Sequence, residues 1–359
     1  MKKSIKLILA ILAVVLVVFG YWFAGCKQPK PIETLSITPE AGTSYKSGDV
    51  VSVKVSAGDS KPDSLVYLVD SVKVKSQKDL SAFTIATDTM RVGPRLITAR
   101  IFQGGKSQEI STNIVLLPAK APVEYTYKVV KVFPHDTGSY TEGLVYQDGV
   151  LYESSGGTTD DMIGQSNIRK ADLNTGKVLQ KTMLDPKVFG EGISIVGDKI
   201  IEVTYHEKIG YVYDKTSLKL LKTFPNNVGI EGWGMCYDGK KLYMDDSTNR
   251  VFFLDKDNYR QIGFIDVYDD KGPVMEINEL EYIDGKIYAN VWEKDIIVII
   301  DPKTGIVLGR IDLSKLYPKD DRARNADVLN GIAFDEKGKR LFITGKKWPH
   351  LYQVEFRTK

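Results

Sequence analysis

Five related segments recur along the last two thirds of the chain, and they constrain its fold more than any other feature. Each segment places an acidic or amide residue directly before or within a short run of apolar residues and glycine. The lead residues are Glu142, Glu191, Glu231, Asn278 and Asn330, at successive spacings of 49, 40, 47 and 52 residues. Repeats of about 40 to 50 residues built from β-type units are typical of a propeller with one blade per repeat. The chain is therefore expected to be all-β, with a five-bladed β-propeller.

Turn signals inside the repeats support this interpretation. Asp-Gly stands between two apolar runs at Asp148-Gly149, Asp238-Gly239 and Asp284-Gly285. This dipeptide is the strongest short-range signal for a tight β-hairpin. Further along each repeat, a turn that begins with Asp is expected to join the two outer strands of the blade. These turns begin at Asp172, Asp214, Asp255 and Asp301.

The five lead residues are expected to surround one axial channel. In a propeller the first strand of each blade lines the axis, so the residue that precedes it lies at the channel mouth. The lead residues would then form a ring of three carboxylates and two amides. The alternative is that they are turn residues that face water. Their restriction to Glu and Asn favours the ring, because a solvated turn accepts Ser, Asp or Lys equally well.

The N-terminal segment, residues 1–26, is typical of an export signal. Lys2, Lys3 and Lys6 precede an apolar run that ends in Ala24-Gly25-Cys26. This ending resembles a bacterial lipobox, which implies lipidation of Cys26 and a cell-envelope lipoprotein, periplasmic or associated with the outer membrane. The alternative is an uncleaved anchor, because about 19 apolar residues also suffice to span a bilayer.

Two folded units are expected after this segment. Residues 27–34 are a polar, Pro-bearing linker. Residues 35–118 contain short apparent strands with frequent turns, which favours a small immunoglobulin-like β-sandwich. Residues 124–357 form the propeller, with one short helix expected around Leu313–Tyr317. The strands expected in the sandwich are Val50–Ser56, Ser64–Val69, Phe83–Ala86, Arg95–Phe102 and Gln108–Leu116.

Several kinds of site find no support in the sequence. The three histidines lack metal-ligand spacing, Cys236 stands alone as a buried-thiol candidate, and no Gly-x-Ser-x-Gly elbow is present. We expect no catalytic metal, although the sequence leaves a structural calcium ion open. The pair Asp245-Asp246 is expected to be a solvated turn. The net charge of +3 indicates no nucleic-acid partner.

A series of motifs over residues 125–356 resembles the glutaminyl cyclotransferases of the plant and bacterial type. Each motif alone is weak, but their order and number make the resemblance specific. It implies a five-bladed propeller that converts the N-terminal glutamine of peptides or proteins to pyroglutamate and releases ammonia. The motifs are Phe133-Pro134-His135-Asp136, Tyr140-Thr141-Glu142-Gly143-Leu144, Phe189-Gly190-Glu191-Gly192, Glu231-Gly232-Trp233-Gly234, Asn278-Glu279-Leu280-Glu281, Ala289-Asn290-Val291-Trp292, Leu329-Asn330-Gly331-Ile332-Ala333 and Thr344-Gly345-Lys346 with Trp348-Pro349.

The resemblance also implies roles for individual residues. Glu191 is the expected proton shuttle between the α-amine and the leaving nitrogen, and Lys346 and Asn278 are the expected donors to the amide or to the tetrahedral intermediate. The remaining residues would bind the substrate, with Asn330 alternatively pinning the fifth blade. They are Tyr140, Glu142, Phe189, Glu231, Trp233, Trp292 and Asn330.

Other functions stay open at this point. The chain is expected to act as a monomer without a cofactor, on peptides or proteins that begin with Gln. A propeller that binds a peptide or carbohydrate and catalyses nothing is the alternative. A hydrolytic propeller of the lactonase type would need a metal held by Glu, Asn and Asp, and the sequence shows no Asp partner on the ring.

Overall fold

The computed structural model describes residues 32, 34–160 and 163–359, and these residues form an almost purely β protein. The one helical element among them is the single 3₁₀ turn η1 (Lys319–Asp321). The helix predicted around Leu313–Tyr317 is wrong, because that segment forms a turn closed by the Leu316 amide and the Leu313 carbonyl, 2.8 Å apart. No helix in this described part is long and apolar enough to span a bilayer. The predicted export signal and Cys26 lie outside the described residues.

The chain divides into two compact units, and the first contains described residues up to Thr43 together with Val50–Ala86 and Pro94–Val115. Two sheets account for its strands. Valines at alternate positions of β3 are fully buried, as expected for strands that each present one face to a core. One sheet has the order β1 (Ser36–Thr38), β3 (Val50–Ser56), β6 (Phe83–Ala86); the other has the order β2 (Thr43–Lys46), β8 (Lys106–Leu117), β7 (Gly93–Gln103), β4 (Ser64–Val69), β5 (Val72–Gln77).

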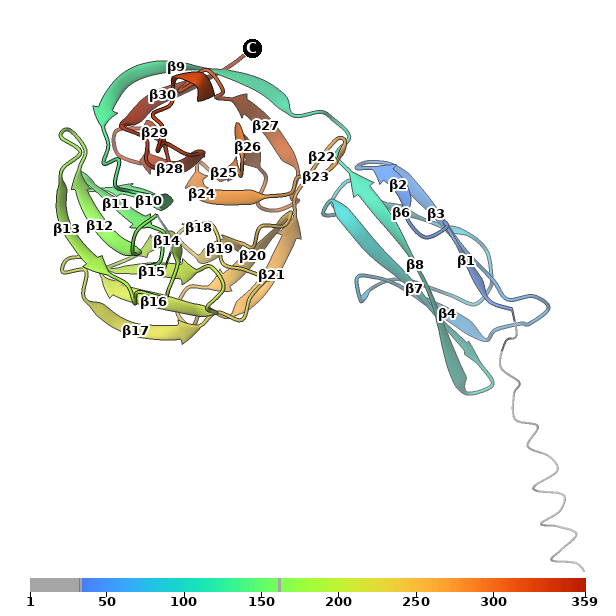
Figure 1. Ribbon diagram of the computed structural model, residues 1–359. Coiled ribbons are helices and arrows are strands. Elements are labelled where there is room, and N and C mark those ends of the chain that lie inside the picture. The colour runs from blue at the N-terminus through green and yellow to red at the C-terminus, as the bar shows by residue number, and fades with distance from the viewer. Residues whose placement is uncertain (1–31, 33, 161–162) are drawn as a thin grey trace, which may run out of the picture. The chain divides into compact units, whose positions relative to one another are not determined.

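The second unit contains the repeats, and its sheets are arranged around a central axis (Figure 1). Its first three sheets each have four antiparallel strands in sequence order. They are β10 (Thr141–Gln147), β11 (Val150–Ser155), β12 (Asn167–Asp172) and β13 (Val178–Met183); β14 (Gly190–Val196), β15 (Lys199–Thr204), β16 (Ile209–Asp214) and β17 (Leu220–Pro225); and β18 (Met235–Tyr237), β19 (Lys241–Asp245), β20 (Arg250–Asp255) and β21 (Gln261–Asp266).

The remaining strands of the second unit form one eight-stranded sheet in the order β24-β25-β26-β27-β9-β30-β29-β28, beside a small pair, β22 (Tyr268–Asp269) and β23 (Gly272–Pro273). In the large sheet β9 pairs in parallel with β27 and antiparallel with β30, so the first strand of the unit joins the last. The bounds are β9 (Val123–Pro134), β24 (Ile277–Ile283), β25 (Lys286–Val291), β26 (Lys294–Ile300), β27 (Val307–Asp312), β28 (Leu329–Asp335), β29 (Arg340–Gly345) and β30 (His350–Thr358).

The innermost strands form a closed ring. Strand β10 contacts β14, β14 contacts β18, β18 contacts β24, β24 contacts β28, and β28 returns to β10. Figure 1 shows these strands around the centre, with β13, β17 and β21 at the periphery. Apolar clusters between neighbouring sheets, such as the one that joins Val251, Ile265 and Ile287, hold the ring together. The ring therefore places the starts of its strands at one end of a common axis.

The turns predicted from Asp-Gly are confirmed at two hairpins. Asp148 and Gly149 have φ values of 52° and 88°, and Asp284 and Gly285 have 45° and 82°. Two successive residues with positive φ are typical of the type I′ turn, whose twist matches that of the flanking strands. These turns reverse the chain between the first and second strands of their sheets. They lie at the ends of the inner strands, opposite the lead residues.

Candidate active site

The lead residues lie where the inner strands break their regular pairing. The register shifts between Thr141 and Gly143, between Gly190 and Ile193, between Ile277 and Leu280, and between Leu329 and Ile332. Such bulges re-aim the side chain of the unpaired residue. The residues inside the four breaks include Glu142, Glu191, Asn278 and Asn330, and all four are at most 5% exposed. The alternative interpretation, in which the lead residues face water, is therefore wrong for these four.

Glycines let neighbouring bulges approach each other closely. A Cβ on Gly192 would lie 2.4 Å from the Trp233 carbonyl oxygen, and one on Gly234 would lie 2.1 Å from the Asn278 carbonyl oxygen. The Gly192 amide also donates to the Trp233 carbonyl at 2.7 Å. Only glycine fits at such a backbone-to-backbone contact. Gly192 and Gly234 therefore allow the neighbouring inner segments to approach each other closely.

A buried ion pair lies at the centre of the candidate site. Lys346 Nζ donates to Glu142 Oε1 at 2.7 Å, and the two side chains are 6% and 2% exposed. Asn330 Nδ2 donates to Glu142 Oε2 at 3.3 Å and to the Thr141 carbonyl at 2.9 Å. Both oxygens of Glu142 are therefore occupied from within the protein. Burial raises the pKa of Glu142 to about 7, although the Lys346 ammonium opposes the rise.

Glu191 is the second carboxyl group of this cluster, and its environment strongly disfavours ionisation. Burial is the largest cause of its raised pKa, followed by the negative charge of Glu142. Asp245 and Glu231 add further repulsion, and only Lys346 acts in the opposite direction. The side chain of Glu191 also forms a hydrogen bond with that of Glu142. Two acids and one ammonium group thus share this site. Burial and the neighbouring carboxylates hold the pKa of Glu191 well above its usual range, and the Lys346 ammonium opposes them.

Aromatic side chains surround the cluster on two sides. The ring of Tyr140 lies 4.5 Å from Lys346 Nζ and makes an edge contact with Phe189. The Tyr140 hydroxyl donates to Asp327 Oδ2 at 2.9 Å. From the other repeats, Trp233 and Trp292 meet edge to face with ring centroids 5.9 Å apart. The four predicted wall residues therefore form two contacting pairs.

Some polar groups of the predicted site have no partner among the described residues. They are Trp233 Nε1, a donor, and Asn278 Oδ1 and Asn330 Oδ1, both acceptors, and all three are buried. Buried polar atoms are normally hydrogen-bonded, so each of these is suited to a ligand's polar group. Glu231 lies further out: it is partly exposed and its Oε1 lies 3.7 Å from His206 Nδ1.

Comparison with known proteins identifies the family of this chain. A family model described as Glutamine cyclotransferase matches residues 99–356. The chain belongs to the glutamine cyclotransferase family. A curated glutaminyl-peptide cyclotransferase of Arabidopsis thaliana is 40% identical over 233 residues, which cover 64% of this chain and 71% of that protein. The crystal structure of Myxococcus xanthus glutaminyl cyclase matches with a TM-score of 0.60 and 31% identity, over 66% of this chain and 99% of that one. The propeller-like fold is thus shared with a solved family member.

Sequence reasoning missed one acid in this family member's site. Asp245 and Asp246 were predicted to form a solvated turn, but their exposed fractions are 0% and 3%. The prediction that the ring has no Asp partner is wrong for the same reason. Asp245 Oδ1 accepts from the Gly234 amide at 3.3 Å, while Oδ2 is buried without a partner in the described part of the chain. Burial raises the pKa of Asp245 well above its usual range.

The inner strand of the third sheet explains why Asp245 is at the axis. Strand β18 has three residues, whereas β10, β14, β24 and β28 each have seven. The segment before β18 is irregular, and its Trp233 amide donates to the Asp245 carbonyl at 3.1 Å. The end of β19 therefore pairs with this irregular inner segment, and the Asp245 carboxyl lies next to Gly234. The sequence Asp245-Asp246-Ser247-Thr248 is typical of an exposed turn and does not indicate that Asp245 is buried.

The described residues contain no group of three or more His, Cys, Asp or Glu side chains arranged to hold a metal ion. His135 is buried and hydrogen-bonded to Glu153 at 3.1 Å and to the Trp348 carbonyl at 2.8 Å. The ion pair with His135 helps to lower the pKa of Glu153 to about 2 against the effect of its burial. Cys236 is a buried free thiol, as predicted. Cys236 lies in the inner strand β18, Glu153 lies in β11, and His135 directly follows β9.

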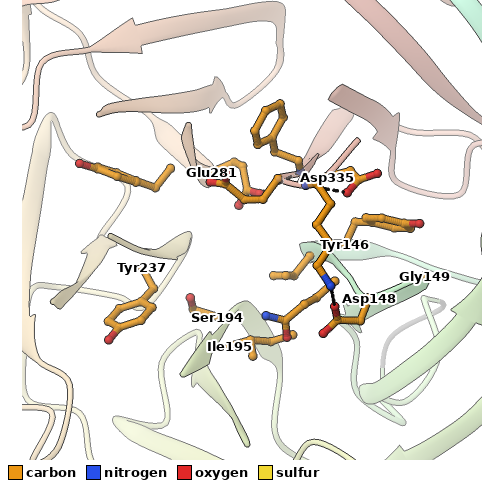
Figure 2. Close-up of a pocket in the computed structure, with 14 residues that line it drawn as sticks. Tyr146, Asp148, Gly149, Ser194, Ile195, Tyr237, Glu281 and Asp335 are labelled. Carbon is orange, nitrogen blue, oxygen red and sulfur yellow. Dashed lines mark hydrogen bonds and ion pairs between the residues drawn. The ribbon is translucent and has the colours of Figure 1, made fainter. Parts of the chain in front are cut away.

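A cavity of about 580 Å³ lies at the opposite end of the axis from the acidic cluster. Figure 2 shows Tyr146, Ser194, Tyr237 and Glu281 around it. These residues come from the ends of the inner strands, whereas Glu142 and Glu191 stand at their starts. Four residues of strand separate Glu142 from Tyr146, which corresponds to about 13 Å. This cavity is therefore separate from the carboxyl cluster.

Proposed function

We propose that this protein is a glutaminyl-peptide cyclotransferase that converts N-terminal glutamine of peptides and proteins to pyroglutamate and releases ammonia. Family membership and the name of the 40% identical Arabidopsis protein support the reaction. The observation that carries the proposal is the buried carboxyl of Glu191, which lies beside the Glu142–Lys346 ion pair. The two pairs of aromatic side chains complete a pocket for the glutamine side chain.

The perturbed pKa of Glu191 suits the first proton transfer. A peptide α-ammonium group has a pKa of about 7.7 to 8.0, whereas an ordinary Glu has about 4.3. Transfer between them would cost about 4 to 5 kcal/mol, because each pKa unit of difference corresponds to about 1.4 kcal/mol. Burial and the Glu142 charge raise the pKa of Glu191 and narrow this gap. Glu191 can therefore take the proton that blocks the nucleophilic lone pair.

Ring closure then needs no second reactant. The freed α-nitrogen attacks the side-chain carbonyl carbon, and a C–N bond forms as the carbonyl oxygen becomes an oxyanion. Collapse of this intermediate breaks the bond to the amide nitrogen, which takes the proton from Glu191 and leaves as ammonia, while the ring nitrogen gives up its extra proton to the freed Glu191 carboxylate. A single carboxyl group thereby acts first as base and then as acid, and such transfers typically contribute about 10²- to 10⁴-fold. Aromatic walls help by holding the glutamine in a folded conformation.

Lys346, Asn278 and Trp233 are the donors proposed for the amide oxygen. Lys346 has three N–H groups, and one of them is engaged by Glu142. The Trp233 indole N–H is buried without a partner among the described residues. A donor aimed at a developing oxyanion contributes about 3 to 4 kcal/mol. Because both Glu142 oxygens are engaged, we assign Glu142 to holding Lys346 in place and to raising the Glu191 pKa.

The finer architecture belongs to the same proposal. We count five blades, with the eight-stranded sheet divided into β24–β27 and β28–β30 with β9, and the ring of innermost strands supports this count. We assign the first unit, at residues 35–118, to an immunoglobulin-like sandwich on the support of its two sheets. The lipobox-like Ala24-Gly25-Cys26 supports a lipoprotein of the cell envelope, tested by mass spectrometry of the mature N-terminus. We also propose that the protein is a monomer, which light scattering would test.

The test is ammonia release from a peptide that begins with Gln, with and without a chelator. We expect release in both conditions from the wild type. We expect a loss of at least 10²-fold from Glu191→Gln, with circular dichroism showing the same fold. Peptide binding without ammonia release would indicate a binding module instead. Loss of release on chelation would replace the proposal with a metal-dependent reaction.

A further inference from the structure

A line of aromatic rings leads from the candidate site to the surface. It begins at Tyr140, beside the buried Lys346, and continues to Phe189 at 6.5 Å between centroids. Phe189 contacts Tyr205 at 5.8 Å, and Tyr205 contacts His206 at 3.6 Å. The side chain of His206 is 60% exposed. Aromatic surface is thus continuous from the proposed glutamine pocket to solvent.

Ile230 lies beside the outer end of this line. The next residue, Glu231, has its Oε1 atom 3.7 Å from His206 Nδ1. The Gly232 amide donates to the Tyr205 carbonyl at 3.0 Å. Ile230 itself is 64% exposed. We call the surface made by Tyr205, His206 and Ile230 the outer shelf.

The backbone that carries the outer shelf is held on several sides. The Tyr205 amide donates to the Phe189 carbonyl at 3.0 Å, which ties the shelf to the pocket wall. The Ile230 amide donates to Asp246 Oδ2 at 3.0 Å. Lys208 Nζ donates to the Gly229 carbonyl at 3.1 Å and to the Ile230 carbonyl. A single exposed isoleucine is common on protein surfaces. Ile230 is different because hydrogen bonds hold its loop in place beside the pocket, which favours a role in binding.

We propose that the outer shelf binds the side chain of the second residue of the peptide substrate and favours an apolar or aromatic one. This inference rests on the proposed function, because it takes the pocket as the place of the N-terminal glutamine. The α-carbonyl of that glutamine must point out of the pocket, so the next residue lies at its rim, about 3.8 Å further along the chain. The continuous aromatic line and the exposed Ile230 give that residue an apolar surface.

The charges around the shelf argue against an acidic second residue. Glu231 lies at its edge, and Glu207 Oε1 accepts from the Phe189 amide at 3.3 Å. The nearby Lys208 ammonium is already engaged by two backbone carbonyls. An aspartate or glutamate at the second position would be repelled by Glu231 and Glu207. Lys208 would not offset this repulsion, because its ammonium group already donates to the loop carbonyls. We therefore expect the order Gln-Phe and Gln-Leu, then Gln-Gly, then Gln-Glu.

The test compares kcat/KM for these four amidated dipeptides. The wild type should process Gln-Phe about tenfold better than Gln-Gly, mainly through a lower KM, because partial burial of a large apolar side chain gives discrimination of this size. Ile230→Ser and Tyr205→Ala should each reduce that ratio to about twofold. Ile262→Ser is the matched control, since Ile262 is 60% exposed on the outer strand β21. It should keep the wild-type ratio.

The outcomes separate this inference from the proposed function. Turnover of all four dipeptides at similar kcat/KM would overturn the outer shelf while the cyclotransferase activity stands. A tenfold preference that survives both shelf variants would also overturn it, because the preference would then arise elsewhere. Absence of ammonia release from every dipeptide would instead refute the proposed function. Thermal melts of each variant show whether a loss comes from the shelf or from unfolding.

Discussion

Replacement of Glu142 by Gln tests whether Glu142 sets the pKa of Glu191. The exchange removes one negative charge beside Glu191 but keeps the side-chain length and an acceptor for Lys346. Asn330 Nδ2 keeps its second acceptor, the Thr141 carbonyl, whichever way the new amide points. The main electrostatic effect is therefore a lower pKa for Glu191. The ammonium of Lys346, relieved of its carboxylate partner, lowers it further.

The size of this change follows from the distance. The two carboxyl groups are within hydrogen-bonding reach, so their charges lie about 4 to 5 Å apart. At an effective dielectric constant of about 20, two unit charges at this distance interact by roughly 3 to 4 kcal/mol, equivalent to about two to three pKa units. In the wild type the two carboxyl groups partly share a proton, so the measured shift in the pKa of Glu191 is smaller than this full value. We expect the acid limb of the kcat/KM profile to move down by about one to two pH units.

The same substitution should slow the reaction at its plateau. If Glu191 becomes a weaker base than the substrate amine, proton removal becomes uphill by about 1.4 kcal/mol for each unit by which its pKa drops. At pH 8 we expect kcat to fall by up to about tenfold for each such unit. The assay is continuous ammonia detection between about pH 5 and pH 9. An acid limb that stays in place, or moves up, would refute the role given to Glu142. Glu281→Gln is the control that should leave the limb unchanged, because Glu281 is a partly buried carboxyl near the other end of the axis.

Three further predictions concern the donors, the buried acids and metal. Lys346→Met should lower kcat/KM by about 10²- to 10³-fold. The stability lost in this variant should grow with pH, because Glu142 and Glu191 then ionise without a neighbouring cation. Activity assays check the first effect, and thermal melts at about pH 6 and pH 9 check the second. Burial raises the folded-state pKa of Glu281 to about 8, so the folded protein holds a proton that the unfolded chain releases, and this stabilisation is lost as pH rises from about 4.5 to 8. The Tm of the wild type should accordingly fall more than that of Glu281→Gln between about pH 5 and pH 8; parallel curves would contradict this. Dialysis against a chelator should leave kcat within about twofold, and restoration of a lost activity by added divalent metal would count against the mechanism.

Local signals in the sequence predicted much of the fold. Strands Val50–Ser56, Ser64–Val69 and Phe83–Ala86 occur as predicted. The side chains of the first alternate between apolar and polar from Val51 onward, whereas the second is a short, almost wholly apolar run. Strand β5, Val72–Gln77, was missed. Its sequence alternates between valine and lysine over residues 72–75, so the signal was present, although the strand is exposed at almost every position. Its strand conformation comes from its pairing with β4.

The site shows the same division between local and tertiary information. Glu142, Glu191, Asn278 and Asn330 were recognisable because each stands in a repeated Gly-rich or Asn-bearing segment. Asp245 was not, because its burial depends on the shortness of β18 and on the path of the segment before it. The contact between Lys346 and Glu142 also joins residues 204 positions apart. No spacing rule in the sequence predicts that pair.

Several carboxyl groups along the axis accept hydrogen bonds from backbone amides of the inner strands. The inner strands are sheet edges, so their unpaired amides need acceptors inside the ring. Glu279 accepts from the Leu144 and Ile332 amides at 3.1 and 2.8 Å, and Glu281 accepts from the Phe334 amide at 2.9 Å. These acids link neighbouring strands, and their burial is compensated by hydrogen bonds.

Glu191 differs from these acids in what surrounds it. Among the described residues no backbone amide donates to its carboxyl group, and the charged groups that act on it most strongly are Glu142 and Lys346. An acid that satisfies backbone amides is tied to the fold and has little freedom to exchange a proton. An acid held by another carboxyl group and one ammonium group keeps a proton that can be moved. Glu191 therefore differs from Glu279 and Glu281 in that its carboxyl group stays available for proton transfer.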